Sequence, residues 1–167
     1  MILKANIKQA YTEQRNNLFL NKSKLIQRDL IEGFTPTSGM IEVISGIRRC
    51  GKSTLMMQIM EKFYKHTGYF NFEDSRVYGF EVADFPKLID VSDKEIDTWF
   101  FDEIQNVNGW ETFIRQLHDN GIKIYLTGSN ASLLSKELGS KLTGRHIRHE
   151  LFPFSYNEFI RFADTRK

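Results

Sequence analysis

The sequence predicts an α/β fold in which a mostly parallel β-sheet is covered by helices on both faces. Short apolar runs rich in β-branched and aromatic residues alternate with segments whose apolar residues recur at helical spacing. Strands that alternate with helices favour parallel pairing, because each helix returns the chain to the same edge of the sheet. The 167 residues, 41% of them hydrophobic, also suffice for one domain with a buried core.

The elements are expected at short intervals along the chain. Residues 1–35 show local helical spacing, as in Ile7 with Tyr11, and are expected to form a helical arm that packs on a core of residues 36–167. Pro86 is expected to break the helix that contains it, whereas Ser155 with Glu158 is expected to cap the last helix. The expected strands cover 40–45, 68–72, 98–101, 122–126 and 147–151, and the expected core helices cover 52–64, 84–91, 110–119, 131–138 and 155–162.

Residues 46–53 match the pattern G-x-x-x-x-G-K-[ST] of a phosphate-binding loop in full. In such a loop the backbone amides turn toward phosphate oxygens, Lys52 reaches the β- and γ-phosphates, and the Ser53 hydroxyl binds magnesium. A strand precedes the loop and an amphipathic helix follows it, as the motif requires, so we predict a site for a nucleoside triphosphate with Mg²⁺. The expected binding residues are Gly46, Ile47, Arg48, Arg49, Cys50, Gly51, Lys52, Ser53 and Thr54.

The variable positions of the loop leave alternatives open. Arg48 and Arg49 are expected either to touch phosphate, to contact another subunit or domain, or to be solvated loop charges. Cys50 is expected to be a small residue that fits the loop, with redox sensitivity as the less favoured alternative. Because it is the one cysteine in the chain, no internal disulfide is expected, which is typical of a cytoplasmic protein.

Two carboxylates follow the apolar run 99–101. Ligands of open α/β sheets bind at the carboxyl ends of strands, so this strand end is expected to enter the nucleotide site. Asp102 is then the second magnesium residue beside Ser53, acting mostly through water. Glu103 is placed to polarise the attacking water, which favours hydrolysis over transfer to a metabolite. The alternative is an ordinary acidic loop after a strand.

The nucleotide is expected to be ATP, because the residues from Asp102 to Gln105 do not match the D-x-x-G pattern of GTPases. Ser129 or Asn130 is expected to sense the γ-phosphate or to orient the water, unless it merely caps the next helix. Arg145, presented by a neighbouring subunit, is expected to stabilise transition-state charge, with a plain surface arginine as the alternative. With Lys52 and Glu103, these residues complete the predicted catalytic set.

Taken together, these segments resemble one known family, the bacterial and archaeal AAA-type ATPases with a G-x-R-R-x-G-K-[ST] loop. The resemblance covers about residues 40–162. The segments that carry it are 45–54, 101–107 with Trp110-Glu111, 126–130, 142–145 and 151–159.

The resemblance implies a P-loop NTPase fold, a three-layer sandwich whose five-stranded sheet has the strand order 5-1-4-3-2. It implies ATP hydrolysis with Lys52, Ser53, Asp102 and Glu103 at the motif positions. Many members continue into a C-terminal domain, often winged-helix or nuclease-like. We therefore expect residues 36–167 to be the N-terminal part of a longer protein, with a C-terminal effector domain or a homo-oligomer as its partner.

Charge and hydropathy exclude some other classes. The net charge of +2 is too small to predict nucleic-acid binding, and no apolar run approaches the ~20 residues of a membrane helix. The aromatic residues of 152–162 are expected to pack on the core, with a docking surface as the alternative. Beside an ATPase that drives a conformational change, two other functions stay open, namely a nucleotide-dependent switch with little turnover and a small-molecule kinase.

Overall fold

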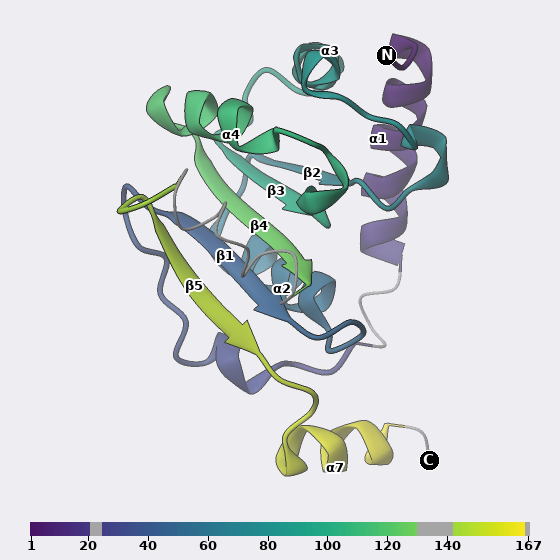
Figure 1. The fold of residues 1–167 in the computed structure, drawn as a ribbon. Helices are drawn as coiled ribbons and strands as arrows, with labels where there is room; N and C mark the ends of the chain where they lie inside the picture. Colours follow the sequence, from purple (N-terminus) through teal and green to yellow (C-terminus); the bar gives the residue numbers. More distant parts are fainter. Residues whose placement is uncertain (21–24, 130–141, 166–167) are drawn as a thin grey trace.

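The computed structural model describes residues 1–20, 25–129 and 142–165, which form a five-stranded parallel sheet between layers of helices (Figure 1). The strands are β1 (Ile41–Gly46), β2 (Thr67–Asn71), β3 (Thr98–Asp102), β4 (Lys123–Ser129) and β5 (His146–Leu151). The helices are α1 (Lys4–Leu20), α2 (Lys52–Phe63), α3 (Phe85–Val91), α4 (Trp110–Asp119) and α7 (Tyr156–Asp164), with a 3₁₀ turn η2 at Asp29–Ile31. The strand order β2-β3-β4-β1-β5 confirms the predicted order, read from the opposite edge.

The two faces of the sheet carry separate cores, as the alternation of side chains along β3 illustrates. Trp99 and Phe101 belong to the cluster formed with α1, α3 and α4, whereas Phe100 belongs to the cluster formed with α2 and η2. Successive side chains of a strand point to opposite faces, so a fully apolar strand is the expected sequence for a sheet covered twice. The predicted three-layer sandwich is confirmed.

Parallel register brings the carboxyl ends of the strands to one edge. Gly46 at the end of β1 pairs with Ser129 of β4 and with Leu151 of β5, and Asn71 pairs with Asp102. The segments that follow β1, β3 and β4 therefore leave the sheet side by side. The functional residues predicted from the sequence lie mostly in these segments.

Most expected elements appear within one to three residues of their predicted bounds. Pro86 does not break its helix, because it lies in the first turn of α3, where a missing amide hydrogen costs nothing. The predicted capping box of Ser155 and Glu158 at the start of α7 is confirmed. The expected helix over 131–138 lies outside the described residues, and the division at residue 35 stays a prediction, although α1 does pack against α3 and β2.

The aromatic residues around α7 do not pack into the core as expected. Phe152, Tyr156 and Phe159 are 67%, 79% and 54% exposed, and the buried residue of α7 is Glu158. This helix extends away from the sheet (Figure 1). Its Glu158 carboxylate contacts Arg28 and the amide of Asp29. None of the described helices is long and apolar enough to cross a membrane.

Candidate functional site

The loop between β1 and α2 depends on two glycines for steric reasons. Gly51 has a φ of 95°, and a Cβ added there would lie 2.7 Å from a guanidinium nitrogen of Arg28. A Cβ on Gly46 would lie 2.4 Å from the carbonyl oxygen of Leu151. Side chains at either position would force the loop away from β5 and from Arg28. Both fixed glycines of the motif are therefore explained by the close approach of another group, and Gly51 also by its positive φ.

Lys52 lies inside the hollow of this loop. Its side chain is 4% exposed, and its Nζ donates hydrogen bonds to the carbonyl oxygens of Gly46 at 3.3 Å and Ile47 at 3.2 Å. The Oε1 atom of Glu103 lies 3.7 Å from the same ammonium group. The lysine is thus already desolvated and oriented into the space that the loop encloses.

Asp102 is a fully buried carboxylate with three hydroxyl donors. It accepts hydrogen bonds from Ser53 Oγ at 2.6 Å, from Tyr69 Oη at 2.9 Å and from Thr127 Oγ1. Burial and the neighbouring carboxylate of Asp102 raise the pKa of Tyr69 far above its ordinary value, so Tyr69 keeps its proton and acts as a donor. The Ser53–Asp102 pair presents two oxygen ligands of the kind that Mg²⁺ prefers.

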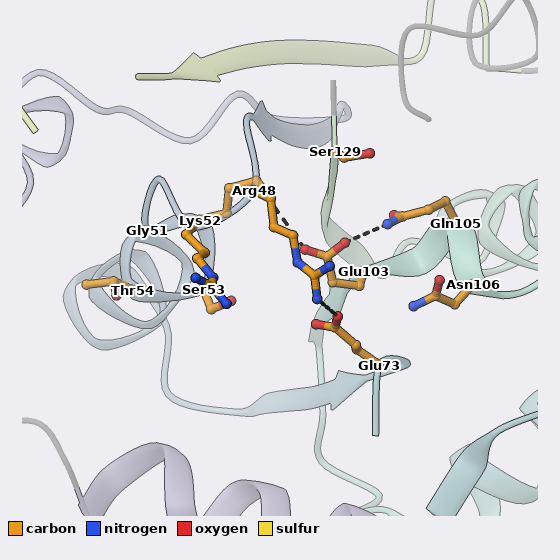
Figure 2. Close-up of a pocket in the computed structure, with 11 residues that line it drawn as sticks. Arg48, Gly51, Lys52, Ser53, Thr54, Glu73, Glu103, Gln105, Asn106 and Ser129 are labelled. Carbon is orange, nitrogen blue, oxygen red and sulfur yellow. Dashed lines mark hydrogen bonds and ion pairs between the residues drawn. The ribbon is translucent and has the colours of Figure 1, made fainter. Parts of the chain in front are cut away.

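Glu103 has an unusual backbone conformation. Its φ of 54° and ψ of 44° place a residue that is not glycine in the left-handed region, at a cost on the order of 1–3 kcal/mol. The amide of Glu103 donates to Thr127 Oγ1 at 3.0 Å, and Gln105 Nε2 donates to Glu103 Oε2 at 2.5 Å. These contacts fix both the backbone and the carboxylate, which points toward Lys52 across the pocket (Figure 2).

A polar cavity of about 520 Å³ opens between the loop and these strand ends (Figure 2). Across it, Arg48 donates to Glu73 Oε1 at 2.7 Å, and both side chains are exposed. The remaining lining residues are Arg49, Gly51, Lys52, Ser53, Thr54, Glu103, Gln105, Asn106 and Ser129.

A second cavity of similar volume adjoins the loop and has a mostly apolar lining. Arg49, Gly51 and Thr54 line both cavities, so the second cavity adjoins the first. Its apolar walls come from the segment before η2 and from the segments around α7. They are formed by Leu25, Ile26, Cys50, Pro153, Phe154 and Phe162, with the guanidinium of Arg28 over the Phe154 ring.

The structure brings together most of the residues that the sequence singles out. Lys52, Ser53, Asp102 and Glu103 converge at one edge of the sheet, and Ser129 lines the same cavity. Cys50 is 5% exposed, which favours its predicted packing role. Asn130 lies outside the described residues.

Arg145 lies far from this cavity in its own chain. It directly precedes the first residue of β5, so it lies at the amino ends of the strands, whereas the phosphate loop lies at their carboxyl ends. Its guanidinium group is paired with Asp119 at 3.2 Å. A role for Arg145 in the site of its own chain has no geometric support. Its predicted role, in which a neighbouring subunit presents it, stays a prediction.

Several residues of the site were not singled out from the sequence. Thr127, Tyr69 and Gln105 contact the two carboxylates directly. Thr127 carried a usable signal, since a polar residue in an apolar strand next to the acidic strand needs a buried partner. Tyr69 and Gln105 carried none that separates them from ordinary core and loop residues.

A family model described as an AAA domain matches residues 38–160, about three quarters of the chain. The chain belongs to this AAA family. The chain shares 40% identity over 146 residues with an uncharacterised protein of Methanocaldococcus jannaschii, covering 86% of this chain and 33% of that protein. An uncharacterised protein of Haemophilus influenzae is 39% identical over 132 residues, covering 72% of this chain and 33% of its own length.

The chain therefore spans a third of the length of the curated relatives that it matches. Among solved structures, a DnaC helicase loader is similar at a TM-score of 0.40 and 16% identity, covering 75% of this chain and 84% of that one. The family match and the sheet topology together establish an AAA-type P-loop ATPase domain, as the sequence predicted.

Proposed function

We propose that this AAA domain binds ATP with Mg²⁺ and hydrolyses it, and that hydrolysis drives a conformational change. The observation that supports this most strongly is the convergence of Lys52, the Ser53–Asp102 pair and Glu103 on one polar cavity. An ammonium group, two magnesium ligands and a candidate general base are the groups that triphosphate hydrolysis needs.

The donor set fits both ligands. The loop amides and Lys52 would hold the phosphates, and Ser53 and Asp102 would hold the metal ion directly and through water. The bound Mg²⁺ supplies charge neutralisation at the phosphate oxygens. Glu103 orients the attacking water and accepts its proton, while Gln105 and Thr127 keep the carboxylate directed into the cavity.

The second cavity suits the purine base. Its lining is mostly apolar, it adjoins the phosphate loop at Gly51 and Thr54, and it offers the aromatic ring of Phe154. Ring stacking and apolar contact are the usual means by which proteins hold a base. The shared wall of the two cavities allows one nucleotide to place its phosphates in the first and its base in the second.

The effector and cellular context are part of the same proposal. The chain spans a third of the length of its relatives. We therefore propose that the domain acts in the cytoplasm, either on a C-terminal effector domain or in a homo-oligomer. The chain carries a net charge of only +2, which gives no support to nucleic-acid binding.

Titration of the protein with MgATP by calorimetry, together with a phosphate-release assay, tests this function. We expect saturable MgATP binding and phosphate release from the wild type, and loss of both in Lys52→Ala. Lys4→Ala serves as a matched control, because Lys4 is exposed, pairs with Asp90 and lines neither cavity. Equal MgATP affinity in the wild type and in Lys52→Ala would refute the assignment of the site.

A further inference from the structure

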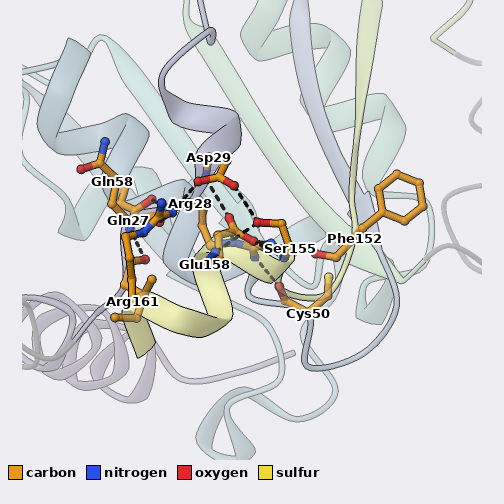
Figure 3. Close-up of polar contacts among 10 residues, drawn as sticks. Gln27, Arg28, Asp29, Cys50, Gln58, Phe152, Ser155, Glu158 and Arg161 are labelled. Atoms are coloured by element: carbon orange, nitrogen blue, oxygen red, sulfur yellow. Dashed lines mark hydrogen bonds and ion pairs between the residues drawn. The ribbon is translucent and has the colours of Figure 1, made fainter. Parts of the chain in front are cut away.

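A buried arginine connects the phosphate loop to the last helix (Figure 3). The side chain of Arg28 is 2% exposed, and its Nη1 donates to the carbonyl oxygen of Cys50 at 2.5 Å. Its Nε donates to Glu158 Oε1 at 2.8 Å, and its Nη2 donates to the carbonyl oxygen of Phe152 at 2.8 Å. One guanidinium group thus joins three segments that are far apart in the sequence.

Glu158 is held from several sides. Its carboxylate also accepts hydrogen bonds from the amides of Asp29 and Ser155, each at 2.7 Å. Burial alone would raise the pKa of Glu158, but the hydrogen bonds from Arg28 and from these amides lower it below its ordinary value. The carboxylate is therefore ionised at neutral pH, and it is the buried side chain of α7.

The stability of the fold does not explain this ion pair well. Burying two charges is costly, and well-packed apolar residues of similar volume are often at least as stabilising. What an apolar pair cannot supply is a donor aimed at the carbonyl oxygen of Cys50. The specific consequence of the pair is therefore the orientation of that carbonyl group.

The carbonyl of Cys50 controls one amide of the phosphate loop. In a trans peptide the carbonyl oxygen and the next amide hydrogen point in opposite directions, and the described residues contain no cis peptide. Arg28 holds the Cys50 oxygen on its own side of the loop, so the amide of Gly51 points to the other side. Gly51 lines both cavities, and an amide directed away from Arg28 toward the polar cavity would be available to a phosphate oxygen.

We propose that Arg28 is a positioning residue of the phosphate loop, and that Glu158 makes the loop geometry depend on the docking of α7. The proposal rests on the proposed function in one respect only, that the loop binds polyphosphate. It assigns to α7 a task at a site that Glu158 does not line. Displacement of α7 would release Arg28 and with it the preset orientation of the Gly51 amide.

Calorimetric titration with magnesium tripolyphosphate tests the proposal, because this probe has no base and cannot report on the second cavity. Glu158→Gln removes the ionic partner that orients Arg28, and the double variant Arg28→Met with Glu158→Met removes the donor to Cys50 itself. The double variant leaves no buried charge unpaired, so it is expected to fold. Tyr156→Ala is the matched control, since Tyr156 lies on α7 but is 79% exposed.

We expect about tenfold weaker tripolyphosphate binding in Glu158→Gln and in the double variant, the effect of one charge-assisted hydrogen bond, and no change in Tyr156→Ala. Wild-type affinity in a folded double variant would overturn the proposal, as would a double variant that does not fold, because the pair would then serve stability. Lys52→Ala distinguishes a failure of the proposed function from a failure of the role given to Arg28. If it too leaves tripolyphosphate binding unchanged, the proposed function fails. If it alone weakens binding, only the role of Arg28 fails.

Discussion

Ser53 Oγ donates a 2.6 Å hydrogen bond to Asp102 Oδ2, a residue 49 positions further along the sequence. The contact joins the start of α2 to the end of β3 and places a hydroxyl and a carboxylate where a magnesium ion can use both. Thr127 and Tyr69 donate to the same carboxylate, so its orientation is set from three sides. The predictions below follow from this arrangement and its surroundings.

Asp102→Asn is expected to reduce ATP turnover by roughly two orders of magnitude or more while the fold is kept, because it removes the charge that attracts the metal ion but keeps the shape. Phosphate release measured against Mg²⁺ concentration checks this, and the half-saturating concentration should rise. The same substitution at the exposed Asp119 is the control. Wild-type turnover and Mg²⁺ dependence in Asp102→Asn would contradict the assignment.

Thr127→Val is expected to lower both stability and turnover. The substitution keeps the shape but leaves the Asp102 carboxylate without one donor and the Glu103 amide without its acceptor. The loss in unfolding free energy is expected to be about 1–3 kcal/mol in urea titrations. Thr127→Ser restores the hydroxyl and should recover most of both quantities. If the serine variant behaves like the valine variant, the hydroxyl is not the group that matters.

Gly51→Ala and Gly121→Ala form a matched pair that separates backbone strain from a specific contact. Both glycines have positive φ, 95° and 83°, but only at Gly51 would the new Cβ meet another group, Arg28 at 2.7 Å. Gly121→Ala is expected to cost about 1 kcal/mol of stability and leave MgATP affinity unchanged. Gly51→Ala should weaken MgATP binding at least about tenfold. Similar MgATP affinities in the two variants would contradict the role given to the loop geometry.

Glu42 is expected to make the protein sensitive to acid. Burial would raise its pKa, but hydrogen bonds from His149, the amide of Thr37 and Lys123 lower it below its ordinary value of 4.5. A folded-state pKa below the unfolded value means that the ionised group stabilises the fold above about pH 4.5, and that this stabilisation is lost as the pH falls further. Urea titrations between pH 6 and about 3 should therefore show a smaller decline for Glu42→Gln than for the wild type. Parallel declines would exclude Glu42 as a source of acid sensitivity.

The sequence predicted the parts of the site whose residues are neighbours in the sequence. Lys52 and Ser53 belong to one motif, and Asp102 and Glu103 follow one apolar strand, so a parallel sheet suffices to bring them together. The strand order came from the family resemblance, because periodicity specifies elements and not their neighbours.

What could not be predicted depends on contacts between distant segments. Arg28 lies in an unremarkable polar stretch, and its partner Glu158 is 130 positions away. Glu158 was identified as a helix-capping residue, which it is, but capping does not predict an ion pair. The aromatic residues of α7 were expected inside because apolar residues usually are, whereas the helix buries its acidic side chain instead.

The central claim, hydrolysis of ATP with Glu103 as the base, is tested most directly by comparing Glu103→Gln with the wild type in MgATP binding and in phosphate release. The glutamine keeps the size of the side chain and one acceptor oxygen but cannot accept a proton from water. We expect MgATP affinity within about threefold of the wild type and phosphate release reduced roughly 100-fold or more. Phosphate release at the wild-type rate, with MgATP bound as tightly, would contradict the account.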